Sequence, residues 1–82
     1  MYILQICNTF SQEILHQQVY EHPYTIEGLL ETVIDWQDWY IYDDKKRTYK
    51  GDYVRHSIVK QGDKTIYKLY FNVKPAKLKE NA

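Results

Sequence analysis

The sequence predicts an α+β domain in which two helices pack on a small antiparallel sheet, in the order strand, helix, helix, strand, strand, strand. Apolar residues recur at helical spacing before residue 40, and the segment after residue 48 is rich in Tyr, Val, Ile and Phe. Gly62-Asp63 divides that second segment in two. At 82 residues and 44 % hydrophobic composition, one core is expected. We predict a single domain over residues 1–75 and a disordered tail over residues 76–82.

The N-terminal segment contains a short apolar stretch followed by helix-start signals. Residues 2–7 favour a strand by their length, although an extension of the following helix is an alternative. Thr9 with Gln12 three residues later fits a capping box, and Ser11 is an alternative cap. The sequence therefore predicts a first helix that begins near residues 9–11.

The two predicted helices are separated by a proline. In the first, Ile14, Leu15 and Val19 recur at helical spacing, and Pro23 ends the helix because it disfavours helical geometry in the preceding residue. Thr25 is a plausible N-cap for the second helix. The buried stripe of that helix is predicted to be Ile26, Leu29, Leu30, Val33 and Ile34, and Trp36, Trp39 and Tyr40 extend the pattern.

The second half of the chain predicts strands. A tight connection through Asp43–Lys46 joins a short strand at residues 40–42 to another near 48–50. Strands 53–61 and 64–73 then form a hairpin, because Gly62-Asp63 suits a two-residue turn with positive φ at the glycine. Pro75 ends the last strand.

The hairpin turn sets a register in which the numbers of opposed residues add to 125. The face that packs on the helices is predicted to hold Val54 with Phe71, His56 with Leu69, and Ile58 with Tyr67. The outer face is predicted to pair Tyr53 with Asn72, Arg55 with Tyr70, Ser57 with Lys68, and Val59 with Ile66. This register therefore places lysine, arginine and tyrosine together on the outside of the hairpin.

Charge is divided along the chain, although the formal net charge is zero. Eight of the eleven acidic residues precede Lys45, and all eleven Lys and Arg residues lie at or after it. The two segments therefore carry formal charges of −8 and +8. Such asymmetry indicates charged partners, unless the two halves neutralise each other in the fold.

Each charged segment defines a candidate binding surface. The acidic surface lies on the second helix and is predicted to bind a basic protein partner or a second copy of the chain; its residues are Glu27, Glu31, Asp35, Asp38 and Trp39. The basic surface is predicted to bind nucleic acid, because cations neutralise phosphates and aromatic rings stack on bases. Its residues are Lys45, Lys46, Arg47, Lys50, Tyr53, Arg55, Lys64, Lys68 and Tyr70.

Signals for catalysis, cofactors or metals are weak. His16 and His22 are six residues apart, which matches no standard ligand spacing, and His56 is predicted to face the core. The single Cys7 is expected to be a buried small hydrophobe, and one cysteine suits a reducing cytoplasm. The sequence offers no membrane-spanning run. We therefore predict no metal, no cofactor and no membrane contact.

One enzymatic alternative comes from a resemblance. The predicted element order is similar to that of small ribosome-dependent ribonuclease toxins of the RelE/ParE type, and residues 51–55, Gly-Asp-Tyr-Val-Arg, resemble their central strand. The resemblance implies a ribonuclease. Members of that family are usually strongly basic, whereas this chain is neutral. The sequence as a whole favours a non-catalytic interaction domain, a regulator or inhibitor that binds a protein through the acidic helix, with nucleic-acid binding by the basic hairpin as the alternative.

Overall fold

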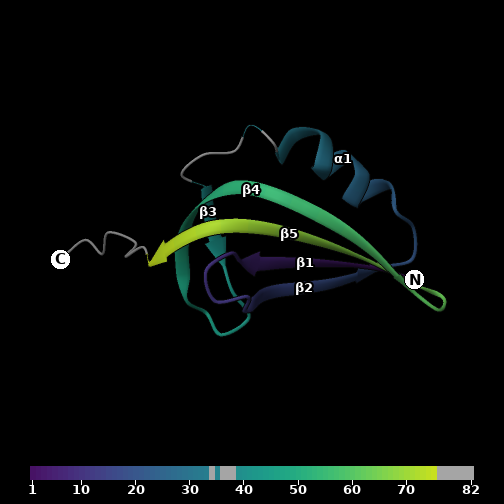
Figure 1. The fold of residues 1–82 in the computed structure, drawn as a ribbon, viewed down its shortest axis with the longest axis horizontal. Helices are drawn as coiled ribbons and strands as arrows, with labels where there is room; N and C mark the ends of the chain where they lie inside the picture. The colour runs from purple at the N-terminus through teal and green to yellow at the C-terminus, as the bar shows by residue number, and fades with distance from the viewer. Residues whose placement is uncertain (34, 36–38, 76–82) are drawn as a thin grey trace.

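The computed structural model describes residues 1–33, 35 and 39–75, which form a five-stranded mixed sheet with one helix (Figure 1). The elements are, in chain order, β1 (Tyr2–Asn8), β2 (Ile14–Tyr20), α1 (Tyr24–Val33), β3 (Trp39–Tyr42), β4 (Thr48–Gln61) and β5 (Lys64–Pro75). The described chain is mostly β, so the predicted class of two helices on a small antiparallel sheet is wrong. The element order that carried the resemblance to ribonuclease toxins is absent as well, because two strands precede the single described helix.

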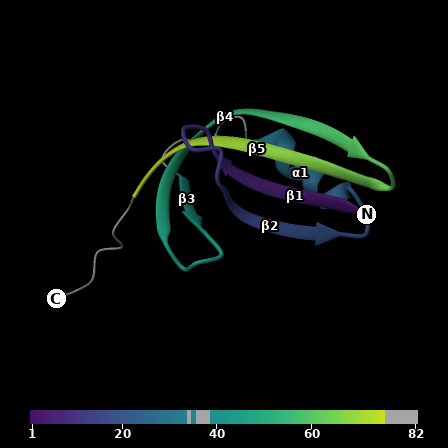
Figure 2. The same ribbon diagram turned by 60° about the horizontal axis from the view of Figure 1, so that its bottom comes forward.

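The strands are ordered β2-β1-β5-β4-β3 across the sheet. β1 pairs in parallel with β5, from Tyr2 opposite Thr65 to Asn8 opposite Phe71, and every other pairing is antiparallel. α1 lies on one side of the sheet, as the turned view in Figure 2 shows. We call that side the helix-covered face and the other side the open face. Within the described residues, no helix is long and apolar enough to cross a bilayer.

The predicted first helix is instead the turn between β1 and β2, followed by β2 itself. Gln12 adopts a φ of 63°, its N–H donates to the Asn8 carbonyl at 2.8 Å, and its side chain donates to the Thr9 carbonyl at 2.9 Å. The residues that resemble a capping box, Thr9 and Gln12, therefore form the turn that connects β1 to β2. Ile14 and Val19 are exposed, so the helical spacing of apolar residues marks no buried stripe. As a strand, β2 forms its backbone hydrogen bonds with one edge of β1. A helix in its place would leave the backbone groups along that edge of β1 unpaired.

The second predicted helix is confirmed but is shorter. Pro23, rather than Thr25, occupies the capping position, since its carbonyl accepts the first helical hydrogen bond from Glu27 N–H at 2.9 Å. The predicted apolar stripe is correct in the described part: Ile26 and Val33 are fully buried, and Leu29 and Leu30 pack against the core. Ile34 and Trp36 lie outside the described residues.

The core lies between α1 and the helix-covered face of β1 and β5. Leu4 and Ile6 of β1 are opposite Tyr67 and Leu69 of β5, and all four side chains are buried. The fully buried ring of Phe71 packs edge-on against Tyr53 and stacks with Trp39, each at a centroid distance of 5.9 Å. Other members of this cluster are Leu15, Ile26, Val33 and Ile41.

The C-terminal hairpin follows the predicted register only near its turn. Gly62 has the expected positive φ of 59°, and pairs from Gln61 opposite Lys64 to Arg55 opposite Tyr70 are as predicted. A bulge between Tyr53 and Arg55 then shifts the register, so that Tyr53 rather than Val54 lies opposite Phe71. The predicted pair of Tyr53 with Asn72 is therefore wrong.

The bulge and the position of α1 also change the predicted core. Val54, His56 and Ile58 are exposed, because the core forms over β1 and β5 rather than over this end of β4. His56 is opposite Leu69 as predicted, but its Nδ1 lies 2.6 Å from the Tyr53 hydroxyl at the surface. The predicted core histidine is thus an exposed residue with a polar partner.

The predicted β3–β4 connection is confirmed, with Trp39–Tyr42 opposite Thr48–Gly51. Gly51 permits a close approach at this pair, since a Cβ there would lie 2.8 Å from Val73 Cγ1 and 3.0 Å from Ile41 Cδ1. The sheet curls so that the β3–β4 connection reaches β2 at the opposite edge. There the Asp44 N–H donates to the Leu15 carbonyl at 2.9 Å.

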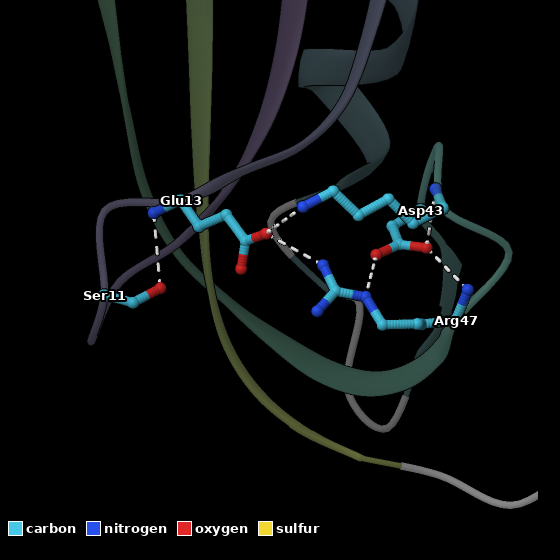
Figure 3. A network of polar contacts seen from close by, with 5 residues as sticks. Ser11, Glu13, Asp43 and Arg47 are labelled. Atoms are coloured by element: carbon cyan, nitrogen blue, oxygen red, sulfur yellow. Dashed lines mark hydrogen bonds and ion pairs between the residues drawn. The ribbon is translucent and has the colours of Figure 1, made fainter.

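Side chains reinforce this contact between the two edges (Figure 3). Arg47 donates from Nε to Asp43 Oδ2 at 2.6 Å and from Nη2 to Glu13 Oε2 at 2.8 Å. The Asp43 side chain is only 1 % exposed, and its Oδ1 accepts from the backbone N–H groups of Lys45 and Arg47. This network is structural, because it satisfies a buried carboxylate and holds the connection against the β1–β2 loop.

The buried carboxylate predicts a pH dependence of stability. Burial opposes ionisation of Asp43, but hydrogen bonds from the Arg47 backbone and side chain outweigh it and hold the pKa of Asp43 below its ordinary value. In the unfolded chain, the Asp43 carboxyl takes up its proton near pH 3.9. The contribution of the ionised carboxylate to the free energy of unfolding is therefore present above about pH 4 and is lost as pH falls through the folded pKa.

In urea unfolding from pH 6 to pH 2, we expect the stability advantage of wild type over Asp43→Asn to shrink. Asp63→Asn, in the exposed β4–β5 turn, is the control; an advantage of Asp43 that persists at pH 2 would contradict this account.

Candidate functional site

The open face carries an excess of cations along β4 and β5. Because opposed residues share a face and side chains alternate, the pairings place these residues together on the open side. The cations among them are Lys50, Arg55, Lys64, Lys68 and Lys74. In the described part of these two strands, Asp52 is the acidic residue on the same side. The face is therefore locally positive although the chain is neutral.

Arg55 and Tyr70 form the centre of this surface. They are cross-strand partners, as predicted, and the Arg55 guanidinium carbon lies 4.2 Å from the centroid of the Tyr70 ring. Across the described chain, no carboxylate lies within ion-pair distance of Arg55, Lys64 or Lys68. These three cations therefore remain available to an anionic ligand.

A polar row crosses the middle of the open face. It runs from Gln17 through Gln5 and Lys68 to Ser57, each opposite the next. Gln5 Nε2 donates to Gln17 Oε1 at 2.8 Å, whereas the buried Gln5 Oε1 has no hydrogen-bond partner among the described residues. A buried acceptor without a partner costs about 1–3 kcal/mol of folding free energy.

Cys7 lies beside this row and is buried, as predicted. Burial raises the pKa of the Cys7 thiol, and the nearby Lys68 ammonium partly offsets the shift. The thiol therefore stays protonated at neutral pH, which does not suit a nucleophile.

Other residues of the predicted basic surface lie elsewhere. Lys45, Lys46 and Arg47 are in the β3–β4 connection, where Arg47 is engaged by Asp43 and Glu13, and Lys45 Nζ lies 3.8 Å from Glu13. The bulge turns Tyr53 to the helix-covered face, against Phe71. The structure thus brings together Arg55, Lys64, Lys68 and Tyr70, with Lys50 further along β4.

The predicted acidic surface is only partly assembled. Glu27 and Glu31 are exposed one turn apart on α1, but Asp35 lies beyond the helix end in a turn. Trp39 begins β3, and its ring stacks on Phe71 rather than extending the helix. Asp38 lies outside the described residues. Glu27 is in the first helical turn, where the helix dipole favours a negative charge.

A surface cavity of about 450 Å³ lies between β3 and the β1–β2 pair. Trp39, Ile41 and Ile6 supply much of its apolar wall. His16 lines the cavity, and its Nδ1 lies 2.8 Å from Asp44 Oδ1. In the ranges that the structure describes, no group of three or more His, Cys, Asp or Glu side chains is arranged so that it could hold a metal ion.

A second, smaller cavity, of about 190 Å³, lies on the open face and includes Phe10 and Lys74, which were not among the predicted site residues. Phe10 lies between the two alternative caps of the first predicted helix, although the nearby Asn8 and Ser11 are turn-forming residues. Lys74 was left beyond the predicted strand end, although it alternates in phase with Lys68 and Tyr70. No protein-family model, curated protein or solved structure matches this chain.

Proposed function

We propose that this protein is a binding domain that takes single-stranded nucleic acid on the open face of its sheet. The observation that carries the proposal is the set of cations on β4 and β5, around the Arg55–Tyr70 stack, that have no carboxylate partner among the described residues. Elsewhere in the described chain, Arg47 and Lys45 have such partners. Such cations on the open face offer phosphates several contacts without loss of an ion pair between described residues.

One further feature favours a single strand over a duplex. The guanidinium of Arg55 lies over the Tyr70 ring and forms a planar group on which an unpaired base can stack. This contact needs the face of a base, which stacking inside a duplex would hide. We also propose that the protein is located in the cytoplasm, which the single Cys7 favours.

Salt dependence of binding tests this proposal. With three to five cations at phosphates, the logarithm of the binding constant for a 15-nucleotide DNA strand should fall against log salt with a slope of about −2 to −3.5. Between 50 and 200 mM salt, affinity should therefore drop about 15- to 130-fold. A matched duplex, measured by fluorescence anisotropy, should bind more weakly. Undetectable binding of single strands at 50 mM salt would reject the proposal.

A second candidate is capture of a basic protein partner by α1, or of a second copy of this chain. The supporting observation is that Glu27 and Glu31 are exposed and have no cation within ion-pair distance among the described residues. Reversal of Glu31 and Asp35 to Lys should then abolish partner capture without unfolding the domain. Capture that survives this reversal would exclude the acidic surface.

A further inference from the structure

The smaller cavity lies where the β1–β2 loop meets the ends of β4 and β5 on the open face. Its volume of about 190 Å³ is below the roughly 300–1,000 Å³ of pockets that enclose drug-sized ligands. The residues that matter here are Phe10, Lys50, Asp52, Asn72 and Lys74. They supply an aromatic ring, two cations and two hydrogen-bonding side chains around a space that fits one small planar group.

Phe10 is held outside the core by its own loop. The side chain is 74 % exposed, although phenylalanine is usually buried. The Thr9 N–H donates to the Phe71 carbonyl at 2.9 Å, and the Phe10 N–H donates to Asn8 Oδ1 at 3.0 Å. These bonds fix the loop against β5 and present the ring to the cavity. A base that stacks on such a ring gains about 1–3 kcal/mol.

Two lysines from neighbouring strands line the cavity. Lys50 and Lys74 are directly opposed on antiparallel strands and share the open face. The Lys50 ammonium lies 5.4 Å from the centroid of the Tyr40 ring, its other cross-strand neighbour. One phosphate at the cavity would accept charge-assisted hydrogen bonds from both side chains.

We infer that this cavity is a subsite for one nucleotide, with the base stacked on Phe10 and the phosphate between Lys50 and Lys74. Asn72 offers the base edge a donor and an acceptor. The inference rests on the proposed function, because the same face would carry the rest of the strand. The shared chemistry is a nucleoside monophosphate, either free or as one unit of a strand.

The test compares Phe10→Ala with a matched control on the other side of the molecule. Tyr24, at the start of α1, is an aromatic residue with the same 74 % exposure. For a 15-nucleotide DNA strand, we expect Phe10→Ala to weaken binding about 5- to 100-fold and Tyr24→Ala to leave it unchanged. Lys50→Ala with Lys74→Ala should make the salt slope less steep by about 1.4.

A second arm uses free nucleoside monophosphates and amide chemical shifts. Changes at Phe10, Lys50 and Lys74 that disappear in Phe10→Ala would support the subsite even if no strand binds, and would then identify a free nucleotide as the ligand. Strand binding that is equal in wild type and Phe10→Ala would overturn the subsite and leave the proposed function standing. Absence of binding in both arms would overturn both.

Discussion

Replacement of Phe71 by Ala is expected to lower the free energy of unfolding by about 3–5 kcal/mol. Phe71 is fully buried, and Trp39 and Tyr53 both pack against its ring. Its removal leaves a cavity that three different strands would have to fill, and these strands are held in place by backbone pairing. For 82 residues, total stability is expected to be about 4–12 kcal/mol, so the variant should lose a large share of its stability.

Urea unfolding followed by circular dichroism measures this effect. Ile58→Ala is the matched control, since Ile58 is a large apolar residue of the same sheet that is 51 % exposed. We expect the control to lose less than about 1 kcal/mol. If Phe71→Ala also lowered the free energy of unfolding by less than about 1 kcal/mol, the core would not be centred on the Phe71 ring.

Charge reversal of Arg55 and Lys68 to Glu is expected to weaken binding of a single strand by at least about 100-fold at 50 mM salt. The reversal removes two phosphate contacts and places two repulsive charges in the middle of the open face. Long-range attraction also falls, because the net charge of the chain becomes negative. Fluorescence anisotropy with a labelled strand gives the change in affinity.

A control with the same change in net charge separates the surface from the total charge. Lys45→Glu with Lys46→Glu alters two exposed lysines in the β3–β4 connection, away from the Arg55–Tyr70 stack. We expect the affinity of this variant for the single strand to fall by less than about tenfold. Equal losses in the two double variants would mean that affinity follows net charge, and the open face would not be a defined site.

The sequence predicted the elements whose signals are local. Gly62-Asp63 defined the hairpin turn and therefore the pairs near it, such as Arg55 with Tyr70. The apolar stripe of α1 was evident because Ile26 and Val33 repeat at helical spacing and are buried together. In each case the residues that decide the structure lie within about ten positions of one another.

The errors concern structure decided at long range. β2 is a strand because β1 supplies its hydrogen bonds, and β1 is itself fixed by parallel pairing with β5, more than sixty residues away. The bulge between Tyr53 and Arg55 contains no glycine or proline that would have predicted it. It nevertheless moves Tyr53 from the open face to the helix-covered face. The candidate site was therefore predicted in part: Arg55, Lys64, Lys68 and Tyr70 share the open face, whereas Phe10 and Lys74 depend on a loop and a strand end that the pattern did not reveal.

The proposed ligand lies on the open face and not on α1. Backbone amide chemical shifts of the labelled protein, recorded during titration with a 15-nucleotide DNA strand at 50 mM salt, distinguish these two locations. We expect the largest changes at Arg55, Lys68 and Tyr70, with none along Tyr24–Val33. Changes concentrated on α1, with β4 and β5 unaffected, would show that the open face is not the binding site.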